Sequence, residues 1–382
     1  MLYQGYGVCL GMLQRIMPAE CFTALGLMTG TSMDGIDMAL IRTDGEQVVE
    51  VLAPKMLVAF DDSQRTALRS VMGGKGDIQD VERTLTDAHA AAVQDFMTEF
   101  NLSSKDIDLV GFHGQTIAHN PGRKMTWQIG DGQYLANEIG IPVVNQFRVN
   151  DVAAGGQGAP LVPLYHAARA ANLAKPVAIL NIGGVGNVTY IGADGALLAF
   201  DTGPGNALID DWLLKHTGVP RDTGGKIARH GTVDEAWIAK VLQAPYFAKK
   251  PPKSLDRHDF HQFSVDHLDL ADGAATLTAL TVATTKAALQ HFPEPPREWL
   301  ITGGGRHNAF MMDLLQRVFN VPVRPVESIG WDGDFLEAEA FAYLAVRSKK
   351  GLALTLPTTT GVNKPLSGGQ LHTPVGKQFA AL

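Results

Sequence analysis

Three glycine-rich stretches of the sequence carry residue types that suit chemistry on a phosphate group. The first, MTGTSMDGID (residues 28–37), joins two apolar runs by a turn that holds glycines, hydroxyls and acids. The second, AFDTGPGN (199–206), and the third, ITGGGRHNAF (301–310), each follow or end an apolar run and precede a helical pattern. Backbone N–H groups in such turns, and at helix N-termini, bind anionic oxygens. The three stretches therefore predict phosphate-binding loops.

The acids in these stretches set two different expectations. Asp34 and Asp37 would repel a bare phosphate, but one of them can hold Mg²⁺ through water, and the metal reverses that repulsion. Asp201 ends an apolar strand beside a Gly-Pro-Gly loop, where a carboxylate next to a phosphate site suggests catalysis. Turns favour the same residues, so the first stretch is also compatible with a solvated hairpin loop, and Asp201 with an Asx turn.

Short β-like runs alternate with helical patterns along the chain, which is the organisation of an α/β protein. These runs end in glycine-rich turns and occupy residues 109–114, 141–147, 176–184 and 298–305. Asn206 is expected to cap a helix that Gly218 terminates, and Asn308 to cap the helix after the third stretch. Ligands are therefore expected where strands pass into helices.

Length and composition limit the classes of function. A chain of 382 residues is too long for one ordinary core, so two domains with a cleft between them are expected. The net charge is −7 and no Lys/Arg-rich block occurs, which argues against nucleic-acid binding. No apolar run reaches the roughly 18 residues of a membrane helix, and the N-terminal residues lack a signal-peptide pattern. With only two cysteines, we expect a soluble cytoplasmic protein whose partner is a small molecule.

Domain boundaries are expected where the sequence changes character. Residues 151–163, DVAAGGQGAPLVP, are rich in small residues and turn formers, so the first crossover is placed there. A second crossover near residues 330–347 would return the chain to the first domain. We therefore predict an N-terminal extension and two domains: 1–21 as the extension, 22–155 plus 336–382 as domain I, and 156–335 as domain II.

The order of an acidic hairpin, a D-x-G loop and a late G-G-G before a helix resembles the superfamily of sugar kinases, Hsp70 and actin. Longer blocks narrow the resemblance to the anhydro-N-acetylmuramic acid kinases, over roughly residues 22–375: GLMTGTSMDGIDMAL, FHGQTIAHNP, QIGDGQYLA, DVAAGGQGAPLVP, LNIGGVGNVTY, FDTGPGNALIDDW, PYFAKKPPKS, ITGGGRHNAF and DFLEAEAFAYLA. The resemblance implies a two-domain, actin-like ATPase fold of the α/β class. Its halves would be ribonuclease H-like, with the active site in the cleft between the domains.

The resemblance also implies a reaction. It is that of a cytoplasmic enzyme of peptidoglycan recycling, which opens 1,6-anhydro-N-acetylmuramic acid with water while ATP phosphorylates O6. In the family, the aspartate that matches Asp201 is the base that activates the water. Because the γ-phosphoryl group captures the departing oxygen, one carboxylate suffices where other glycoside cleavage needs two. Mg²⁺ as a cofactor and a homodimeric assembly are implied as well.

In the family, the loop that matches the first stretch binds the ATP phosphates. The candidate nucleotide-binding residues are this loop and the glycines of the other two: Gly30, Thr31, Ser32, Met33, Asp34, Gly35, Ile36, Asp37, Gly203, Gly303, Gly304 and Gly305. Asp34, acting through water, is the candidate metal ligand.

The sugar needs hydrogen-bonding groups from the opposite lip of the cleft. The candidates are His113, Gln115, Arg148, Asp151 and Glu337. Arg148 can hold the lactyl carboxylate of the sugar with two parallel hydrogen bonds. For each candidate, a local structural hydrogen bond or ion pair is an alternative. The chain also departs from the family pattern beside Arg148, with Gln146 and Asn150 where an acid and an arginine are frequent.

Two rival functions are compatible with the same motifs. One is a kinase of the same superfamily that acts on an intact sugar hydroxyl. The other is an actin-like or Hsp70-like ATPase, in which hydrolysis drives domain movement and no small acceptor is used. Comparing N-acetylmuramic acid with its anhydro form separates the first rival, and sugar-independent ATPase activity would support the second.

Overall fold

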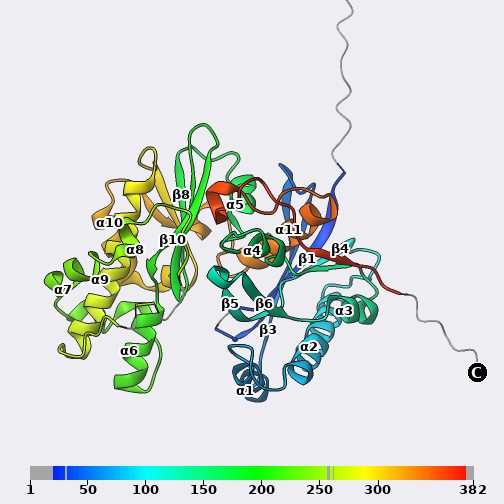
Figure 1. Ribbon diagram of the computed structural model, residues 1–382, viewed down its shortest axis with the longest axis horizontal. Coiled ribbons are helices and arrows are strands. Elements are labelled where there is room, and N and C mark those ends of the chain that lie inside the picture. Colours follow the sequence, from blue (N-terminus) through cyan, green and yellow to red (C-terminus); the bar gives the residue numbers. More distant parts are fainter. Residues whose placement is uncertain (1–19, 31, 256–258, 261, 376–382) are drawn as a thin grey trace, which may run out of the picture.

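Two lobes lie side by side in the structure (Figure 1), and each is built on its own β-sheet. The computed structural model describes residues 20–30, 32–255, 259–260 and 262–375. Thr31 and most of the expected N-terminal extension lie outside the described residues. We call the six-stranded sheet with its helices the first lobe, and the five-stranded sheet with its helices the second lobe.

The sheet of the first lobe has the strand order β13-β7-β4-β1-β2-β3. Its strands are β1 (Phe22–Met28), β2 (Gly35–Thr43), β3 (Val49–Ala59), β4 (Leu109–Phe112), β7 (Val143–Asn145) and β13 (Gln370–His372). The β1–β2 and β2–β3 pairs are antiparallel, while β1–β4 and β4–β7 are parallel. A separate hairpin follows β4 and consists of β5 (Gln115–Asn120) and β6 (Met125–Ile129).

The helices of the first lobe cover this sheet, and one of them packs exceptionally close to it. They are α1 (Asp62–Ser70), α2 (Ile78–Glu99), α3 (Gly132–Ile139), α4 (Val149–Ala153) and α11 (Leu336–Lys349), whereas α12 (Pro357–Thr360) lies against the strand Leu197–Pro204 of the other sheet. A Cβ atom at Gly26 of β1 would lie 1.8 Å from the carbonyl oxygen of Ala338, and one at Gly111 of β4 would lie 2.2 Å from that of Phe341. The backbone of α11 therefore lies directly on the middle of the sheet.

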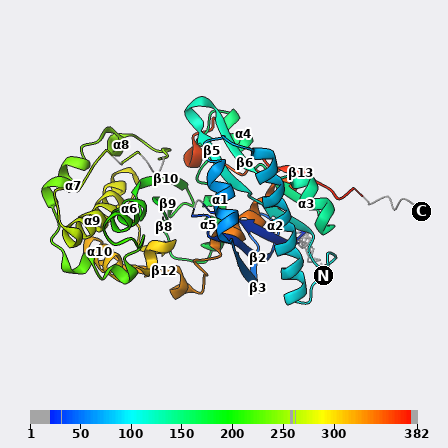
Figure 2. The same cartoon turned by 90° about the horizontal axis from the view of Figure 1, so that it is seen from below.

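The sheet of the second lobe has the strand order β10-β9-β8-β11-β12. Its strands are β8 (Val177–Ile182), β9 (Val185–Ile191), β10 (Leu197–Pro204), β11 (Glu298–Thr302) and β12 (Val323–Pro325). Its main helices are α6 (Ala207–Thr217), α7 (Glu235–Val241), α8 (Pro245–Ala248), α9 (Leu270–Ala288) and α10 (Ala309–Val318). Figure 2 shows α6, α9 and α10 gathered on the side of this sheet that faces away from the first lobe.

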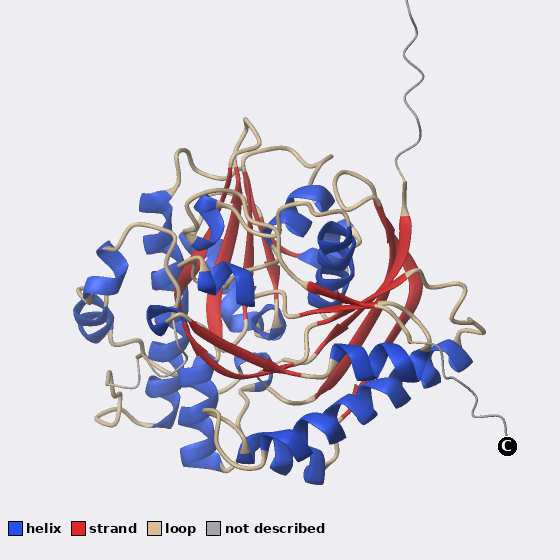
Figure 3. Ribbon diagram, turned by 45° about the vertical axis from the view of Figure 1, so that its right-hand side comes forward, coloured by secondary structure: helices blue, strands red, loops and turns tan. Residues whose placement is uncertain are grey.

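The two sheets, which appear as two groups of strands in Figure 3, share one connectivity. In the order third-second-first-fourth-fifth, β3-β2-β1-β4-β7 matches β10-β9-β8-β11-β12, with two antiparallel pairs followed by two parallel pairs. The expected α/β fold with two similar halves is confirmed. Between the lobes lies α5 (Pro163–Arg169), whose Tyr165 belongs to a hydrophobic core that includes residues of both sheets.

Local expectations about helix ends are confirmed for α10 and only in part for α6. The Oδ1 of Asn308 accepts a hydrogen bond of 3.0 Å from the Met311 N–H and so caps α10. Gly218 ends α6 with a left-handed φ of +74°. Asn206 precedes α6, but its side chain makes no capping hydrogen bond, because it bonds to the end of β8 instead.

The region chosen for the first crossover contains more helix than its small residues indicated, because α4 covers its beginning. The domain boundaries at 155/156 and 335/336 stay predictions. None of the helices in the described residues combines the length and the apolar character that a membrane span requires.

Candidate active site

Asp201 lies on β10, where the pairing with β9 shifts register between Asp201 and Gly203. The residue is 8% exposed, and its Oδ2 accepts a hydrogen bond of 2.8 Å from the Leu255 N–H. Burial raises the pKa of Asp201 to about 7, and the hydrogen bond from Leu255 opposes that rise. A carboxyl group that titrates near neutral pH can take a proton from water, which is the task of a general base.

The turn between β1 and β2 offers a ligand main-chain groups and short polar side chains. The Met33 N–H donates to the Gly30 carbonyl at 3.1 Å, and Met33 has a positive φ of +54°. The side chains of Met33 and Ile36 belong to the hydrophobic core, so only their main-chain atoms can reach a ligand. Ser32 Oγ donates to Asp34 Oδ1 at 2.8 Å, and both side chains are exposed.

Asp37 follows this turn on β2, beside a concentration of acids. Burial raises its pKa to about 7, and nearby carboxylates add to the rise; in decreasing order of effect they belong to Asp34, Glu337, Asp334 and Asp332. Gly35, at the start of β2, lies close against β3, since a Cβ there would lie 2.4 Å from the Val58 carbonyl oxygen. So much negative charge in one place favours a divalent cation.

The residues of this turn fit a magnesium ion that is bound mainly by other oxygens. Among the described residues, no three His, Cys, Asp or Glu side chains converge to hold a metal by themselves. Mg²⁺ usually keeps several waters and takes only one or two carboxylates beside the phosphates of a nucleotide. Asp34 and Asp37 meet that requirement, and the acids around Asp37 supply the charge.

In the second lobe, the β8–β9 turn occupies the place that the β1–β2 turn has in the first. Its two glycines are bound from the D-x-G loop: Gly183 O accepts from Asn206 N at 2.7 Å, and Gly184 O accepts from Gly205 N at 3.0 Å. The Asn206 side chain donates to the Ile182 carbonyl at 2.9 Å. The D-x-G loop and the β8–β9 turn therefore form one compact backbone surface.

The G-G-G stretch joins the same surface. Gly303 has a φ of +74°, and a Cβ there would lie 2.2 Å from Asn181 Oδ1, so a larger residue is excluded on both grounds. A Cβ at Gly305 would lie 2.4 Å from the Ile182 side chain, whereas Gly304 is more open. All three glycines thus follow β11; Gly303 and Gly305 lie against the end of β8, and Gly304 faces the Asn206 side chain.

Arg148 immediately precedes α4 and is held by His113. The imidazole of His113 donates from Nδ1 to the Gly114 carbonyl at 2.7 Å, so Nε2 accepts from Arg148 Nε at 3.1 Å and from Nη2 at 3.0 Å. Burial and the guanidinium hold the pKa of His113 well below its usual value, so the ring is neutral. Burial also lowers the pKa of Arg148 to about 10, which leaves it charged at neutral pH.

Glu337 links Arg148 to the first phosphate-binding candidate. It lies in the first turn of α11, where it stays accessible to water but is surrounded by protein. Burial raises its pKa, and the charge of Arg148 lowers it. Glu337 also raises the pKa of Asp37. The structure therefore brings Arg148, Glu337 and Asp37 into one electrostatic group.

Asp151 and Gln115 lie deeper than the other sugar candidates. Asp151 Oδ1 accepts from the Gly158 N–H and Oδ2 from the Thr360 hydroxyl, both at 2.6 Å. Asp151 thereby fixes the glycine whose carbonyl accepts a 2.7 Å hydrogen bond from Arg148 Nη1. Gln115 is fully buried, and its Oε1 has no hydrogen-bond partner among the described residues. Contact of either side chain with a sugar stays a prediction.

The loop that binds Asp201 and the segment that binds Arg148 meet at a contact between the lobes. Ser254 Oγ donates to Gln157 Oε1 at 2.6 Å. Ser254 is next to Leu255, which binds Asp201, and Gln157 is next to Gly158, which binds Arg148. The proposed base and the proposed sugar lip thus lie on opposite sides of this contact.

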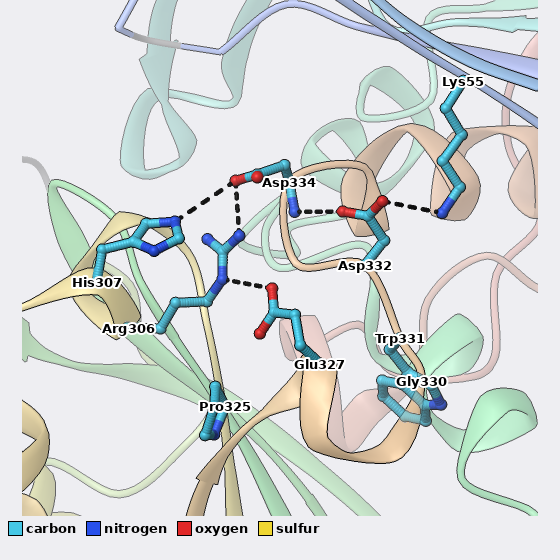
Figure 4. A pocket seen from close by; sticks show the side chains of 9 residues that line it. All are labelled: Lys55, Arg306, His307, Pro325, Glu327, Gly330, Trp331, Asp332 and Asp334. Atoms are coloured by element: carbon cyan, nitrogen blue, oxygen red, sulfur yellow. Dashed lines mark hydrogen bonds and ion pairs between the residues drawn. The ribbon is translucent and has the colours of Figure 1, made fainter.

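A cavity of about 700 Å³ lies between β3 of the first lobe and the loops after β11 and β12 of the second (Figure 4). Arg306 Nε donates to Glu327 Oε1 and its Nη2 to Asp334 Oδ1, both at 2.7 Å. On the opposite wall, Lys55 Nζ lies 3.2 Å from Asp332 Oδ2. The segment that carries Asp332 and Asp334 is therefore bound to both lobes just before α11 begins.

Several residues near the site were missed by the sequence analysis. The two glycines of the β8–β9 turn could have been found, because this hairpin repeats the place of β1–β2 and its sequence, LNIGGVGN, is one of the blocks of the resemblance. Leu255 could not, because it acts through a main-chain N–H that every residue except proline possesses.

Comparison with known proteins agrees with these features. The family model for anhydro-N-acetylmuramic acid kinase matches residues 22–374. An anhydro-N-acetylmuramic acid kinase from Paramagnetospirillum magneticum is 55% identical over 354 residues, which cover 92% of this chain and 99% of that protein. One from Rhodospirillum rubrum is 51% identical over 352 residues, covering 91% of this chain and 93% of that protein.

Likeness to solved structures is much weaker than these matches. A ROK hexokinase from Thermus thermophilus matches with a TM-score of 0.39 and 15% identity, covering 85% of this chain and 99% of that one. The fold assignment therefore rests on the strand order of the two sheets. From the family model and the curated relatives, the chain belongs to the anhydro-N-acetylmuramic acid kinase family and is a kinase.

Proposed function

We propose that this kinase opens 1,6-anhydro-N-acetylmuramic acid with water while it transfers the γ-phosphoryl group of ATP to O6, giving N-acetylmuramic acid 6-phosphate and ADP. The observation that carries the proposal is Asp201. It is a buried carboxylate with a pKa raised to about 7, and it lies beside a glycine loop at a helix N-terminus. Among the described residues, no charged side chain contributes to that shift, which comes from burial.

The bond changes balance around one water molecule. Its oxygen forms a bond to the anomeric carbon, its proton goes to the Asp201 carboxylate, and the bond from that carbon to the bridging oxygen breaks. The bridging oxygen, now O6 of the sugar, takes the γ-phosphoryl group, and ADP leaves. A second carboxylic acid is not needed to protonate the departing oxygen, because that oxygen bonds to the γ-phosphoryl group instead.

The phosphates are proposed to lie between the two hairpin turns. The β1–β2 turn offers main-chain N–H groups with Gly30 and Ser32, and the second lobe offers the glycine surface formed by the β8–β9 turn and the D-x-G and G-G-G loops. Mg²⁺, when bound through Asp34 and Asp37, would neutralise the charge of the phosphates.

The sugar is proposed to bind against Arg148. His113 and Gly158 accept from three of the five N–H groups that a guanidinium carries. One N–H then remains on each terminal nitrogen, a pair that suits a carboxylate. The lactyl carboxylate is the group of the proposed substrate that matches it, so His113 and Asp151 would act by positioning Arg148.

An isotope experiment tests the reaction. The enzyme is given ATP and the anhydro sugar in H₂¹⁸O, and the product is analysed by mass spectrometry after a short reaction. We expect one ¹⁸O on the anomeric carbon and none in the phosphate. Unlabelled N-acetylmuramic acid 6-phosphate kept in the same solvent controls for exchange. Label in inorganic phosphate, with the sugar unchanged, would contradict the proposal.

Feeding N-acetylmuramic acid itself separates the principal alternative, a kinase of an intact sugar hydroxyl. We expect phosphorylation of the anhydro sugar and little of the open one. The opposite preference would establish the alternative, whereas ADP release that is unchanged by either sugar would establish an ATPase without a small acceptor. A role in cytoplasmic recycling of peptidoglycan and a homodimeric assembly belong to the same proposal, and light scattering of the purified protein tests the latter.

A further inference from the structure

The loop from α8 to Leu255 holds Asp201 on three sides. The Tyr246 hydroxyl donates to the Asp201 carbonyl at 2.5 Å, and the Asp201 N–H donates to the Lys253 carbonyl at 3.0 Å. The Leu255 N–H donates to the Asp201 carboxylate at 2.8 Å. The conformation of this loop therefore determines whether the carboxylate keeps its hydrogen bond.

A buried cation lies at the centre of this loop. Lys253 is only 3% exposed, and its Nζ donates to the carbonyls of Tyr246 at 3.1 Å and Phe247 at 3.3 Å, and to His291 Nε2 at 3.2 Å. The same ammonium lies 4.6 Å from the centre of the Tyr246 ring and 5.6 Å from that of Phe200. Phe200 is the residue before Asp201, so the ammonium joins both ends of the loop to β10.

Burying an ammonium group without a carboxylate partner is costly, and a neutral side chain of the same size would avoid that cost. Among the described residues, no acid forms an ion pair with Lys253. Its carbonyl, imidazole and ring contacts offset the cost only while the loop keeps this shape. The ammonium group thus selects one loop conformation, the one in which the Leu255 N–H reaches Asp201.

We propose that Lys253 is a positioning residue for the base Asp201, and that its ammonium group acts by holding the 245–255 loop so that the Leu255 N–H stays bonded to the Asp201 carboxylate. This inference rests on the proposed role of Asp201. Lys253 itself touches neither the water nor the sugar in this scheme. Its effect is on the orientation and the acidity of the base.

The direction of the effect on pH dependence follows from the contacts. The hydrogen bond from Leu255 lowers the pKa of Asp201, so losing that bond raises the pKa above its value of about 7. The groups that face the Lys253 ammonium are His291 from the turn Leu289–His291, Tyr246 from α8, and Lys249 of the same loop. Burial and Lys249 lower the pKa of Lys253 to about 8, so measurements between pH 5.5 and 7.5 keep most of it protonated.

The test compares Lys253→Met with Lys250→Met, which removes an exposed ammonium group from the same loop. For Lys253→Met we expect kcat to fall about 10-fold or more while KM for ATP stays within about twofold. In the pH profile of kcat, the acid limb should move to higher pH by about half a unit. Lys250→Met should leave all three quantities at the values of the parent protein.

Four outcomes would overturn the proposal or redirect it. A fall in kcat with an unmoved acid limb would show a merely structural role, and parental activity of Lys253→Met would show none. If Lys253→Met does not fold, Lys253→Arg keeps the charge and should retain the parental acid limb; a shifted limb in that folded variant would contradict the proposal. An Asp201→Asn variant that remains active would instead refute the role of Asp201, whatever Lys253 does.

Discussion

Asp37 and Asp201 reach the same pKa of about 7 in different ways. The pKa of Asp201 is raised by burial alone, and a single hydrogen bond opposes the rise. The pKa of Asp37 is raised by burial and by four neighbouring acids. A carboxyl group of the first kind is suited to exchanging a proton with water, whereas one of the second kind is suited to receiving a cation. The cause of a shifted pKa therefore says more about the role of an acid than its value does.

The places of the two acids in the fold explain the difference. Asp37 lies on the second strand of its sheet, beside the start of α11 and its acidic approach segment. Asp201 lies on the third strand of the other sheet, covered by a loop that contributes main-chain groups. The two lobes, whose sheets share one strand order, thus place these two acids in different electrostatic environments. We expect four experiments to separate the roles, in order of decreasing effect.

Replacing Asp201 by Asn should have the largest effect. We expect kcat to fall by about 10² to 10⁴-fold, because the variant lacks the proposed base that takes the proton from water. The dissociation constant of ATP, measured by calorimetry, should change little. Asp194→Asn, an exposed acid near the start of the same strand, is the control. Activity of Asp201→Asn within a few-fold of the parent would abolish the distinction between the two acids.

The same variant should be more stable than the parent protein at alkaline pH. The pKa of Asp201 is 3.8 in the unfolded chain and about 7 in the folded one. Its contribution to stability is therefore complete below pH 3.8 and is lost as pH rises to 7. Above pH 7 the parent buries a charge that costs up to about 4 kcal/mol, which asparagine avoids. Thermal unfolding at pH 4 and pH 8 measures this, and an equal difference at both would contradict it.

Arg148→Lys tests the guanidinium that belongs to the same electrostatic group as Glu337 and Asp37. Lysine keeps the charge but cannot present two parallel N–H groups, so we expect KM for the anhydro sugar to rise about 10 to 100-fold. The sugar without its lactyl group, 1,6-anhydro-N-acetylglucosamine, is the matched control. The parent and the variant should use it equally poorly. If the variant loses as much with the control sugar, Arg148 does not recognise the carboxylate.

Asp37→Asn should give the smallest effect and a different kind of loss. We expect the Mg²⁺ concentration for half-maximal activity to rise on the order of 10-fold, with kcat partly restored at high Mg²⁺. Glu50→Gln, an exposed acid on the neighbouring strand β3, is the control. Should kcat fall without any change in the Mg²⁺ requirement, Asp37 would resemble Asp201 and the comparison would fail.

Much of the fold could be predicted because local signals agree with it. The β-like runs 109–114, 141–147, 176–184 and 298–305 became β4, β7, β8 and β11, and Asn308 caps α10 as its position indicated. Asn206 has the same residue type before a helix but bonds across to β8, because the close approach of two loops offers a carbonyl there. A capping pattern in sequence cannot report such a tertiary competitor.

The candidate site was predictable in its acids and not in their surroundings. Asp201 and Asp37 were chosen from motifs, whereas Leu255, which binds Asp201, lies 54 positions further along the chain, and three of the four acids that raise the pKa of Asp37 lie about 300 positions away. Arg148 was chosen for its possible bidentate bonding. That His113 and Asp151 serve to fix it, directly or through Gly158, depends on the folded path of the chain.

The close packing of α11 on the first sheet has a consequence for synthesis of the protein. This helix is encoded more than 200 residues after the strands β1 and β4 against which its backbone lies. The ribosome therefore synthesises every strand of the second lobe before α11 can cover the middle of the sheet in the first lobe. The nascent N-terminal strands must wait unpacked in the meantime, so chaperones that bind exposed apolar segments should engage them early and let go only when α11 emerges.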